Sequence, residues 1–558
     1  MLKNVAVVVP ISLRAVARSL LGASITVLAL APAQQATAQS AYDLRSAGPG
    51  GVSWVPAIQD QSQVGDCWSF ATTTALDSNL IKNGYLPTST TAPSIALSSW
   101  HLSAYNGAAQ NTVFTPGSAS PYKGISGGYT WMATSYFTRG QGVWTIPQAP
   151  TGPGDIAVMG GGPVLNSNDA LNPFPLQAVN AGENLAPYLP PVSQTPAFTV
   201  TNAFYYDQQG SHRTDAQQVA AVKAAILDHG AVSTYMYAAG YTLNDRREEV
   251  FQYDNTLGYE YAYNPTDPSV KQADHAVTII GWDDNVIIPQ GAATTQGGWI
   301  VQNSWGAWGG TLQQGDGTFY ASYDDPIIGK QGVTAYTAVP EGTYSPVVMQ
   351  NELGPIMRTG DVATALNYPP SGMGIVDASR SSQAISLLTA ESAGTLLALG
   401  LTSVDAQVGD PKSVTVSIYS GLDMVDGQAT WGTLLDTETF AFGQEGYSLF
   451  NLATPLSVTQ GQTLDILVDY HGSPLPYVWQ ATSLNGVAAP VGRTYFYGND
   501  AQAWSDFASF NGSGTYDSNT GIFSIKGLLA VPEIDPAGFG SVAALVTGAL
   551  GLLERRRR

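Results

Sequence analysis

The clearest pattern of hydrophobic and polar positions lies after residue 340, where apolar residues alternate with polar ones. Such runs cover residues 413–419, 464–470 and 521–526, and turns rich in Gly, Asp, Asn and Pro separate them. A period of two residues predicts strands with one buried face, and repeated short strands predict an antiparallel β-sandwich. Helical periodicity is nearly absent from this region. We therefore expect an all-β sandwich domain over residues 341–530.

The first half of the chain mixes several kinds of pattern. The run at residues 68–76, directly after Cys67, can open a buried helix. Residues 275–281 are a β-branched apolar run that ends on glycine, and residues 298–302 predict a second buried strand that leads into a glycine-rich turn. The stretch at about 140–200 is rich in Pro, Gly, Asn and Ala. We expect it to be an insertion that forms a long surface loop, in preference to a lid or a specificity loop.

Two further apolar runs lie near the ends of the chain. Residues 20–31 follow three basic residues and precede an Ala-x-Ala site, which predicts a secretory signal peptide cleaved after Ala38. Residues 537–553 precede Glu554 and four arginines, which predicts a short membrane segment whose basic tail stays cytoplasmic. The expected organisation is a signal peptide (1–38), a first domain (39–340), the sandwich (341–530) and a C-terminal segment (531–558).

The composition and charge of the chain mainly serve to exclude classes of binding partner. Charged residues make up 11% of the chain, and the formal net charge is -20. A strongly acidic chain disfavours nucleic acid and anionic lipid, because both repel it. The acidic residues Asp423, Asp426 and Asp436 do not form a recognisable calcium loop, so we expect no metal and no cofactor.

The chain contains a single cysteine, Cys67. Exported proteins normally use cysteines in pairs, so a solitary thiol is either incidental or kept for its reactivity. Cys67 immediately precedes the predicted helix, and the positive end of a helix dipole favours the thiolate form. A thiolate that attacks carbonyl groups also needs a base, a group that orients the base, and donors for the oxyanion. The alternative is a buried, inert cysteine.

Five histidines are candidates for the base. His275 follows Asp274 and stands at the start of a predicted strand. Asn303 follows the next predicted strand and could accept a hydrogen bond from one imidazole nitrogen, which would leave the other nitrogen to face the thiol. Trp305 could cover that hydrogen bond and exclude water. The other four histidines lie in mixed polar sequence, where a surface or loop role is expected: His101, His212, His229 and His471.

Three segments, in this order, resemble the papain family of cysteine peptidases. They are the stretch from Gln61 to Cys67 with the Trp and Phe that follow, the Asp-His-Ala-Val at 274–277, and the Asn-Ser-Trp-Gly at 303–306. Smaller matches are the glycine pair before Tyr129 and the Gly-Ala-Val-Ser at 230–233. The resemblance covers about residues 40–340. It implies an α+β papain-like two-lobed peptidase fold, with a helical lobe and a β-barrel-like lobe.

The resemblance also implies a role for each matching residue. Cys67 would be the nucleophile, His275 its general base, and Asn303 the group that orients the imidazole. Gln61 would supply its side-chain amide to the oxyanion hole, together with the backbone N–H of Cys67. The reaction would be hydrolysis of peptide bonds in a polypeptide substrate through a thioester intermediate. The implied substrate-binding residues are Gly127, Gly128, Trp305 and Asp274.

Several positions depart from the family pattern. Val64 stands where relatives carry a structural cysteine, so the domain must be held by core burial without a disulfide. Asp66 replaces a small residue before the nucleophile, and a carboxylate there should oppose thiolate formation. Tyr235 or Met236 would line the pocket for a substrate side chain, where a bulky floor would favour small side chains.

The rest of the chain resembles two other kinds of segment. Residues 349–354 and 495–526 are similar to the lectin-like domain that follows papain-like domains in some bacterial surface peptidases. Extracellular polysaccharide is therefore a candidate ligand. For most aromatic residues of this domain, however, we prefer a role in the core of the sandwich. The aromatic residues considered as a sugar-stacking platform are Tyr470, Tyr477, Trp479, Tyr495 and Trp504.

The tail at 531–558 is similar to PEP-CTERM sorting signals of Gram-negative bacteria, in a Val-Pro-Glu-Ile-Asp form. This resemblance implies an exosortase-type processing partner, transient anchoring in the inner membrane, and release or attachment at the cell surface. A plain membrane anchor is the alternative.

The sequence therefore favours an exported cysteine endopeptidase with a β-sandwich accessory domain. The first alternative is a non-catalytic surface adhesin that retains a peptidase fold. The second is a thiol hydrolase of peptidoglycan cross-links, which would share the Cys–His chemistry but fits the Asn-Ser-Trp-Gly segment less well.

Overall fold

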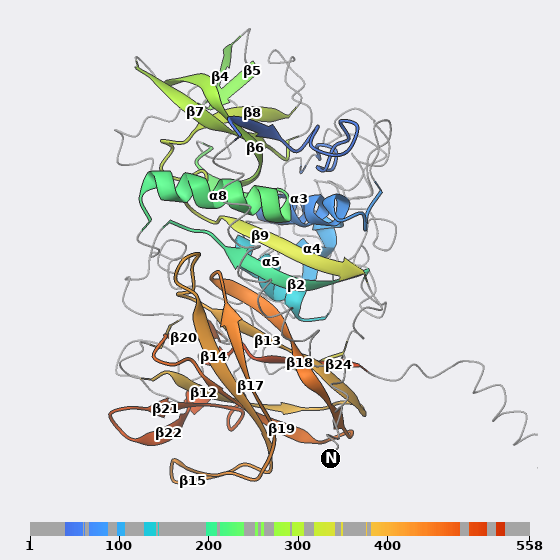
Figure 1. Cartoon of the computed structure of the whole chain (residues 1–558), viewed down its shortest axis with the longest axis vertical. Coiled ribbons are helices and arrows are strands. Elements are labelled where there is room, and N and C mark those ends of the chain that lie inside the picture. Colours follow the sequence, from blue (N-terminus) through green and yellow to red (C-terminus); the bar gives the residue numbers. More distant parts are fainter. Residues whose placement is uncertain are drawn as a thin grey trace, which may run out of the picture.

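The structure is a computed structural model of the whole chain (Figure 1). It describes residues 39–59, 61, 66–87, 97–105, 128–140, 143, 197–208, 213–238, 251–254, 258–261, 273–290, 293–305, 317–340, 347–349, 375–376, 381–479, 490–509 and 521–530. The predicted signal peptide, the C-terminal segment and most of the predicted insertion lie outside these residues, as do Val64, Gly127 and His212. None of the helices in the described ranges is long and apolar enough to cross a membrane.

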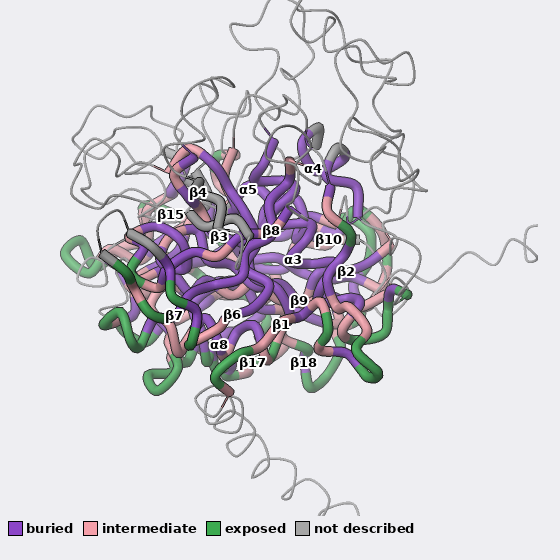
Figure 2. The backbone as a smooth tube through the Cα atoms, turned by 90° about the horizontal axis from the view of Figure 1, so that it is seen from above, coloured by how far each residue is buried: buried purple, intermediate pink, exposed green. Residues whose placement is uncertain are grey.

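Helix α3 (Cys67–Lys82) occupies the interior of the first half, where Figure 2 colours it as buried. It packs against strands β6 (His275–Gln290) and β9 (Thr334–Pro340) and against helices α4 (Ser99–Tyr105) and α5 (Thr130–Thr138). Its polar side chains can be buried because many bond to backbone carbonyls. Thr72 Oγ1, for example, donates to Trp68 O at 2.8 Å. The predicted buried helix after Cys67 is confirmed.

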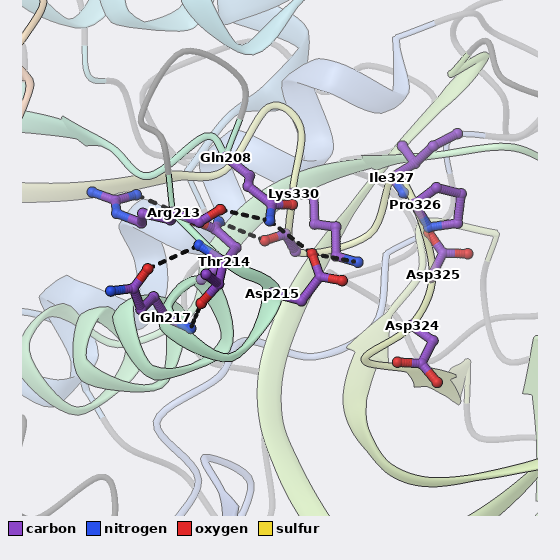
Figure 3. Close-up of polar contacts among 12 residues, drawn as sticks. Gln208, Arg213, Thr214, Asp215, Gln217, Asp324, Asp325, Pro326, Ile327 and Lys330 are labelled. Atoms are coloured by element: carbon purple, nitrogen blue, oxygen red, sulfur yellow. Dashed lines mark hydrogen bonds and ion pairs between the residues drawn. The ribbon is translucent and has the colours of Figure 1, made fainter.

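Helix α8 (Asp215–His229) covers the sheet beside α3. Its N-terminus has a capping box, in which Thr214 Oγ1 accepts from Gln217 N and Gln217 Oε1 accepts from Thr214 N (Figure 3). Asp215 Oδ1 accepts from Gln208 Nε2 at 2.7 Å and lies 3.5 Å from Lys330 Nζ. These contacts fix the start of α8 against the turn before β9.

A long, mostly antiparallel sheet runs through both halves of the chain. Within the described residues its strand order is β10 (Val347–Met349), β24 (Lys526–Ala530), β13 (Gly394–Ser403), β18 (Gly446–Val458), β2 (Phe198–Tyr205), β9 (Thr334–Pro340), β3 (Val232–Met236), β6 (His275–Gln290), β7 (Ala293–Gln302), β8 (Thr318–Ser322), β5 (Gly258–Tyr261) and β4 (Phe251–Asp254), and β1 (Ala41–Asp43) pairs with β6. Only β5 and β8 pair in parallel among these strands.

The prediction that the strand from His275 ends at Gly281 is wrong. Strand β6 continues to Gln290, and its register with β7 shifts next to Gly281. The glycine serves a different purpose, because β1 pairs with β6 there: a Cβ atom at Gly281 would lie 2.2 Å from Tyr42 O. The N-terminal segment therefore docks closely on β6, and Leu44 behind it is fully buried.

The first half contains two hydrophobic core clusters. One lies around α8 and the central strands and includes Val232, Trp282 and Trp299. The other lies around α3, α4 and α5 and includes Trp68 and Tyr136. The start of α3 and the start of β6 meet at the second cluster, since Cys67 and Ala276 both belong to it.

A second sheet of the C-terminal half has the order β17 (Thr433–Phe442), β14 (Lys412–Ser420), β19 (Thr463–Asp469), β12 (Gln383–Thr389), β21 (Thr494–Gly498) and β22 (Ala503–Asp506). Its buried side chains, such as Val416 and Ile466, share a core cluster with Leu399 of β13, so two sheets pack face to face. Small sheets and a short helix complete this region: β11 (Ile375–Val376), β20 (Leu475–Trp479), β23 (Gly521–Phe523), β15 (Asp423–Val425), β16 (Gln428–Thr430) and η3 (Phe507–Ser509).

The sandwich pattern predicted from the sequence matches these strands, with one correction. The run at 521–526 is not one strand, because β23 ends at Phe523 and β24 begins at Lys526. Tyr470 is buried in the sandwich core, and the ring of Tyr477 packs edge-on against Phe507 at 4.8 Å. Core packing is therefore the role of both rings. The side chain of Trp479 lies outside the described residues.

The two halves join through strand pairing between β18 and β2. Gly446 takes a φ of 129° there, and a Cβ atom on it would lie 2.0 Å from Ala203 O. Tyr205 N also donates to Glu445 O at 2.9 Å. The backbone of the sandwich therefore lies directly against that of the first half.

Candidate active site

Cys67 is the first residue of α3, and its side chain is almost fully buried. The backbone carbonyl of Asp66 accepts the first bonds of the helix, from Ser69 N at 2.8 Å and Phe70 N at 3.3 Å. The carboxylate of Asp66 does not cap the helix. Instead, its Oδ2 atom accepts a hydrogen bond from Ser103 Oγ in α4 at 3.2 Å. The thiol therefore stands at the positive end of a helix, next to a buried carboxylate that is held by α4.

His275 is the first residue of β6, and its Nε2 atom lies 2.8 Å from Asn303 Oδ1. Asn303 follows the last residue of β7, and the β6–β7 hairpin pairs Thr278 with Gln302. The hairpin therefore brings together two residues that are 28 positions apart. The backbone N–H of Ser304 also donates to Asn303 Oδ1 at 2.8 Å.

This second bond identifies the tautomer of the imidazole. A backbone N–H can only donate, so its partner on Asn303 must be the amide oxygen. That oxygen accepts from His275, which places a proton on Nε2. In the neutral imidazole the other nitrogen, Nδ1, then carries the lone pair. In this tautomer His275 can accept a proton at Nδ1.

Trp305 stacks on the imidazole of His275, with ring centroids 4.6 Å apart and an interplanar angle of 24°. His275 and Asn303 are both buried. An indole over the imidazole shields the His275–Asn303 hydrogen bond from water, which strengthens it.

Gln61 is buried at 1% exposure and is held from two sides by Ser304. Gln61 N donates to Ser304 O at 2.8 Å, and Ser304 Oγ donates to Gln61 Oε1 at 2.5 Å. The bond to Oε1 directs the amide nitrogen of Gln61 away from Ser304. Ser304 thus links Gln61 to Asn303, a role that the sequence did not suggest. The only available signal was its position between Asn303 and Trp305.

The nucleophile helix is fixed to the strand that carries His275. Thr278 Oγ1 in β6 donates to Ala71 O in α3 at 3.0 Å. Cys67, the first residue of α3, and Ala276, the second residue of β6, belong to the same core cluster. Hydrogen bonds therefore connect Gln61, Asn303 and His275 through Ser304, and β6, which begins at His275, is bonded to the helix that begins at Cys67.

The predicted substrate-binding residues have different surroundings. Gly128 lies against the indole of Trp68, where a Cβ atom would be 2.3 Å from Nε1, so only glycine fits without movement. Asp274 Oδ1 accepts from Ala238 N at 2.6 Å, which ties the start of β6 to the end of β3. Gly127 lies outside the described residues.

The two residues expected at a side-chain pocket differ in exposure. Met236 is fully buried in the core cluster around α8. Tyr235 is half-buried, and its ring meets Tyr129 edge-on with centroids 6.4 Å apart. Tyr235 is therefore the better candidate for a pocket wall.

Two histidines differ from the expected surface or loop role, since His101 is buried within α4 and His229 is half-buried at the end of α8. His101 is fully buried in α4, where Nδ1 bonds to Tyr136 Oη, and burial lowers its pKa to about 3. His229 ends α8 and stacks on Phe204 at 4.7 Å, and burial lowers its pKa to about 3. His471 is exposed, as predicted. Over the described ranges, no group of three or more His, Cys, Asp and Glu residues is arranged to hold a metal ion.

The family model described as papain family cysteine protease matches residues 38–320 of the chain. A comparison with curated proteins finds no match. Among solved structures, the chain is similar to the cysteine protease and lectin-like domains of Cwp84, a surface layer associated protein of Clostridium difficile. The TM-score is 0.56 and the sequence identity 18%, and the likeness covers 88% of this chain and 89% of that chain.

A second similar structure is clostridial Cwp84 with a cysteine-to-alanine substitution, after propeptide cleavage. Its TM-score is 0.55 and its sequence identity 18%, and the likeness covers 88% of this chain and 99% of that chain. At this identity the likeness concerns the fold alone. It extends over the sandwich as well as the first half, so the predicted papain-like fold followed by a lectin-like domain is confirmed at that level.

Proposed function

Because this chain belongs to the papain family of cysteine proteases, we propose that it is an exported endopeptidase with Cys67, His275, Asn303 and Gln61 as its catalytic residues. The chain is a cysteine peptidase, and it contains one cysteine. The observation that carries the proposal is the hydrogen bond of 2.8 Å between His275 Nε2 and Asn303 Oδ1. It orients an imidazole whose other nitrogen, Nδ1, can accept a proton from a thiol at the start of α3.

The first half of the reaction forms a thioester. Cys67 transfers its proton to His275 Nδ1, and the thiolate attacks the carbonyl carbon of the peptide bond. The oxyanion that develops accepts hydrogen bonds from the Gln61 side-chain amide and the Cys67 backbone N–H. The imidazolium then protonates the leaving amine, the C–N bond breaks, and the acyl group remains on sulfur.

The second half releases the acid product. His275, neutral again, takes a proton from water, and the resulting hydroxide attacks the thioester carbonyl. The C–S bond breaks, and the imidazolium returns its proton to the Cys67 sulfur. The helix dipole of α3 favours the thiolate in both halves, whereas the buried carboxylate of Asp66 opposes it.

The test is cleavage of an unfolded protein substrate by the mature full-length chain, in parallel with Cys67→Ala. We expect cleavage that disappears in the variant, and covalent labelling of the wild type alone by an epoxide inhibitor of thiol peptidases. Equal cleavage by both chains would contradict the proposal. Absence of cleavage together with clearing of purified cell walls would favour a peptidoglycan hydrolase instead.

The architecture of the peptidase half fits the two lobes expected from the family. Its two core clusters, one around α3, α4 and α5 and one around α8 and the central strands, support a division into a helical and a β-rich lobe. The constellation of Cys67 and His275 would lie between them. We infer domain limits at 39–340 and 341–530.

We infer export to the cell surface from the predicted signal peptide at 1–38 and the tail at 531–558. The similar Cwp84 is described as surface layer associated, which agrees with this placement. The tail would anchor the chain transiently in the inner membrane until an exosortase-type enzyme cuts it. Mass spectrometry of the exported protein tests this inference. A C-terminus at residue 558 would contradict it.

We also infer that the sandwich binds extracellular polysaccharide. The similar sandwich of Cwp84 is called lectin-like. A row of half-buried rings supports the inference: Tyr419 and Trp431 lie 4.6 Å apart, Trp431 and Trp504 6.1 Å, and Trp504 and Tyr497 5.4 Å. Such rings offer an apolar face to sugars and a polar edge to water. Retention of the full chain on an insoluble neutral polysaccharide should fall in the double variant Trp431→Ala, Trp504→Ala, and unchanged retention would contradict this.

A further inference from the structure

One side of α5 carries three buried threonines at a spacing of four residues, Thr130, Thr134 and Thr138. Residues four apart lie one above the other on a helix. Tyr336 of β9 contacts this side, since its Oη donates to Thr130 O at 3.2 Å and lies 3.5 Å from Thr134 Oγ1. We call Thr130, Thr134, Thr138 and Tyr336 the polar seam of α5.

The N-terminal end of the polar seam lies beside the candidate active site. Thr130 N and Thr130 Oγ1 are each 3.1 Å from Tyr235 Oη, and Tyr235 belongs to β3, the strand that pairs with the start of β6. Two residues before Thr130, Gly128 packs on the indole of Trp68. Trp68 follows Cys67 in the chain, so the position of α5 determines where the segment at Gly128 lies relative to the thiol.

The C-terminal end of the polar seam meets the sandwich. Lys526, the first residue of β24, donates from Nζ to Thr138 Oγ1 at 2.8 Å, across 388 positions of the chain. Thr138 Oγ1 in turn donates to Thr134 O at 2.8 Å. The lysine is therefore linked through one hydroxyl to the backbone of α5.

The surroundings of Lys526 make this contact specific. The lysine is 1% exposed, and its ammonium lies 5.8 Å from the centre of the Tyr447 ring. A buried ammonium is stable only if it is hydrogen-bonded, and a cation is favourable at the C-terminal end of a helix such as α5. Tyr447 belongs to the same core cluster as Cys67. The sandwich thus contributes a ring and a charge to the interior of the peptidase half.

We propose that Lys526 is a positioning residue of the peptidase, supplied by the sandwich, which acts through the polar seam of α5 on the substrate-binding segment at Gly128. The inference rests on the proposed function, because it concerns the same active site. Lys526 lies outside the segment 38–320 that matches the family. The sandwich then helps to position the substrate-binding segment of the peptidase, in addition to acting as a binding module. Loss of the lysine leaves the thiol chemistry in place and weakens substrate binding.

The test uses the mature full-length chain with Lys526→Met, which keeps the length of the side chain and removes its charge. We expect kcat/KM for a peptide substrate to fall about tenfold, mainly through a higher KM, because a hydrogen bond to a charged group is lost. The rate at which iodoacetamide alkylates Cys67 should stay within about twofold. Amide hydrogen exchange in α5 should become faster. The matched control is Lys412→Met, at a sandwich lysine that pairs with Asp410 at the surface, and it should change none of these.

Thr138→Val tests the same contact from the other side and should raise KM in the same way. An unchanged KM in either folded variant overturns the inference. So does a parallel loss of kcat, alkylation rate and thermal stability, because that marks a general loss of structure. Failure of both variants to fold overturns it too, since the contact would then be a requirement of folding. Wild-type cleavage that persists in Cys67→Ala would instead remove the proposed function, so the two failures are distinguishable.

Discussion

The sandwich and the peptidase half bury their cores in different ways. In β14 of the sandwich, Val414, Val416 and Ile418 face the core, and the polar residues between them are less buried. In α3 of the peptidase half, fifteen of the sixteen residues are buried, polar ones included. One region separates polar from apolar side chains by face, and the other takes both kinds into its interior.

The buried polar residues of α3 connect segments that are distant in the chain. Asp77 Oδ1 accepts from Leu97 N at 3.0 Å, and Asn79 Nδ2 donates to His229 O at 2.8 Å. Buried polar groups are stable only when they are hydrogen-bonded. The peptidase half therefore uses hydrogen bonds as tertiary contacts, whereas the sandwich core is mainly apolar. Buried amides and hydroxyls also connect the residues of the candidate active site.

The largest expected effect concerns the buried amide of Gln61. Gln61→Ala should lower kcat/KM by about 100- to 1000-fold, or about 3–4 kcal/mol, because an oxyanion donor is lost. Trp504→Ala in the sandwich is the control and should leave peptide cleavage unchanged. Steady-state kinetics on a short peptide measures both. A loss in kcat/KM below about threefold in Gln61→Ala would show that Gln61 is not a donor of the oxyanion hole.

The next largest effect is expected on stability, where removal of a buried carboxylate in the peptidase half is compared with removal of an exposed carboxylate in the sandwich. Asp77→Ala should lower the free energy of unfolding by about 3 kcal/mol, since Leu97 N–H loses its acceptor inside the protein. Asp410→Ala, at an exposed carboxylate of the sandwich, should change it by less than about 0.5 kcal/mol. Urea unfolding of the two variants provides the values. Similar losses from both would mean that the two halves do not differ in this way.

The buried carboxyl of Asp325, in the turn before β9, should make the stability of the peptidase half depend on pH. Burial raises the pKa of its carboxyl to about 6, while hydrogen bonds from Ile328 N and Ile327 N act in the opposite direction (Figure 3 shows the turn). The folded state therefore binds this proton more tightly than the unfolded chain does. The stabilisation is complete below about pH 4 and is lost as the pH rises through about 6.

Asp325→Asn cannot titrate, so its stability relative to the wild type should improve by about 2 kcal/mol between pH 4 and pH 7. Thermal unfolding at a series of pH values measures the difference. A constant difference between wild type and Asp325→Asn would contradict the account of the buried carboxyl.

The smallest effect is expected at Ser304. Ser304→Ala removes the hydroxyl that holds Gln61 Oε1, so kcat should fall about tenfold with little change in KM. In a Gln61→Ala background the same substitution should have almost no further effect, because the two residues act as a unit. Full additivity of the two losses would show that Ser304 does not act through Gln61.

The sequence predicted those parts in which local pattern decides the structure. The alternation at 413–419 identified β14, and the run after Cys67 identified the start of α3. The motif around His275 and Asn303 indicated a pair that the β6–β7 hairpin does bring within 2.8 Å. Their catalytic roles remain a prediction.

The sequence did not predict contacts that depend on the packing of distant segments. His101 looked polar and exposed, yet α4 places it against Tyr136 in the interior. The threonines of α5 are visible at a spacing of four, but nothing in the sequence relates Thr138 to Lys526, 388 positions away. Local periodicity carries no information on which far segment supplies a partner.

The central claim is that the only thiol and the imidazole of His275 work as a pair. The most direct measurement is the rate at which iodoacetamide alkylates Cys67 at neutral pH, in the wild type and in His275→Ala. Because the chain has one cysteine, the label reports on a single site. The account predicts alkylation at least about tenfold slower in the variant, since the thiolate loses its base. Equal rates in the two chains would contradict it.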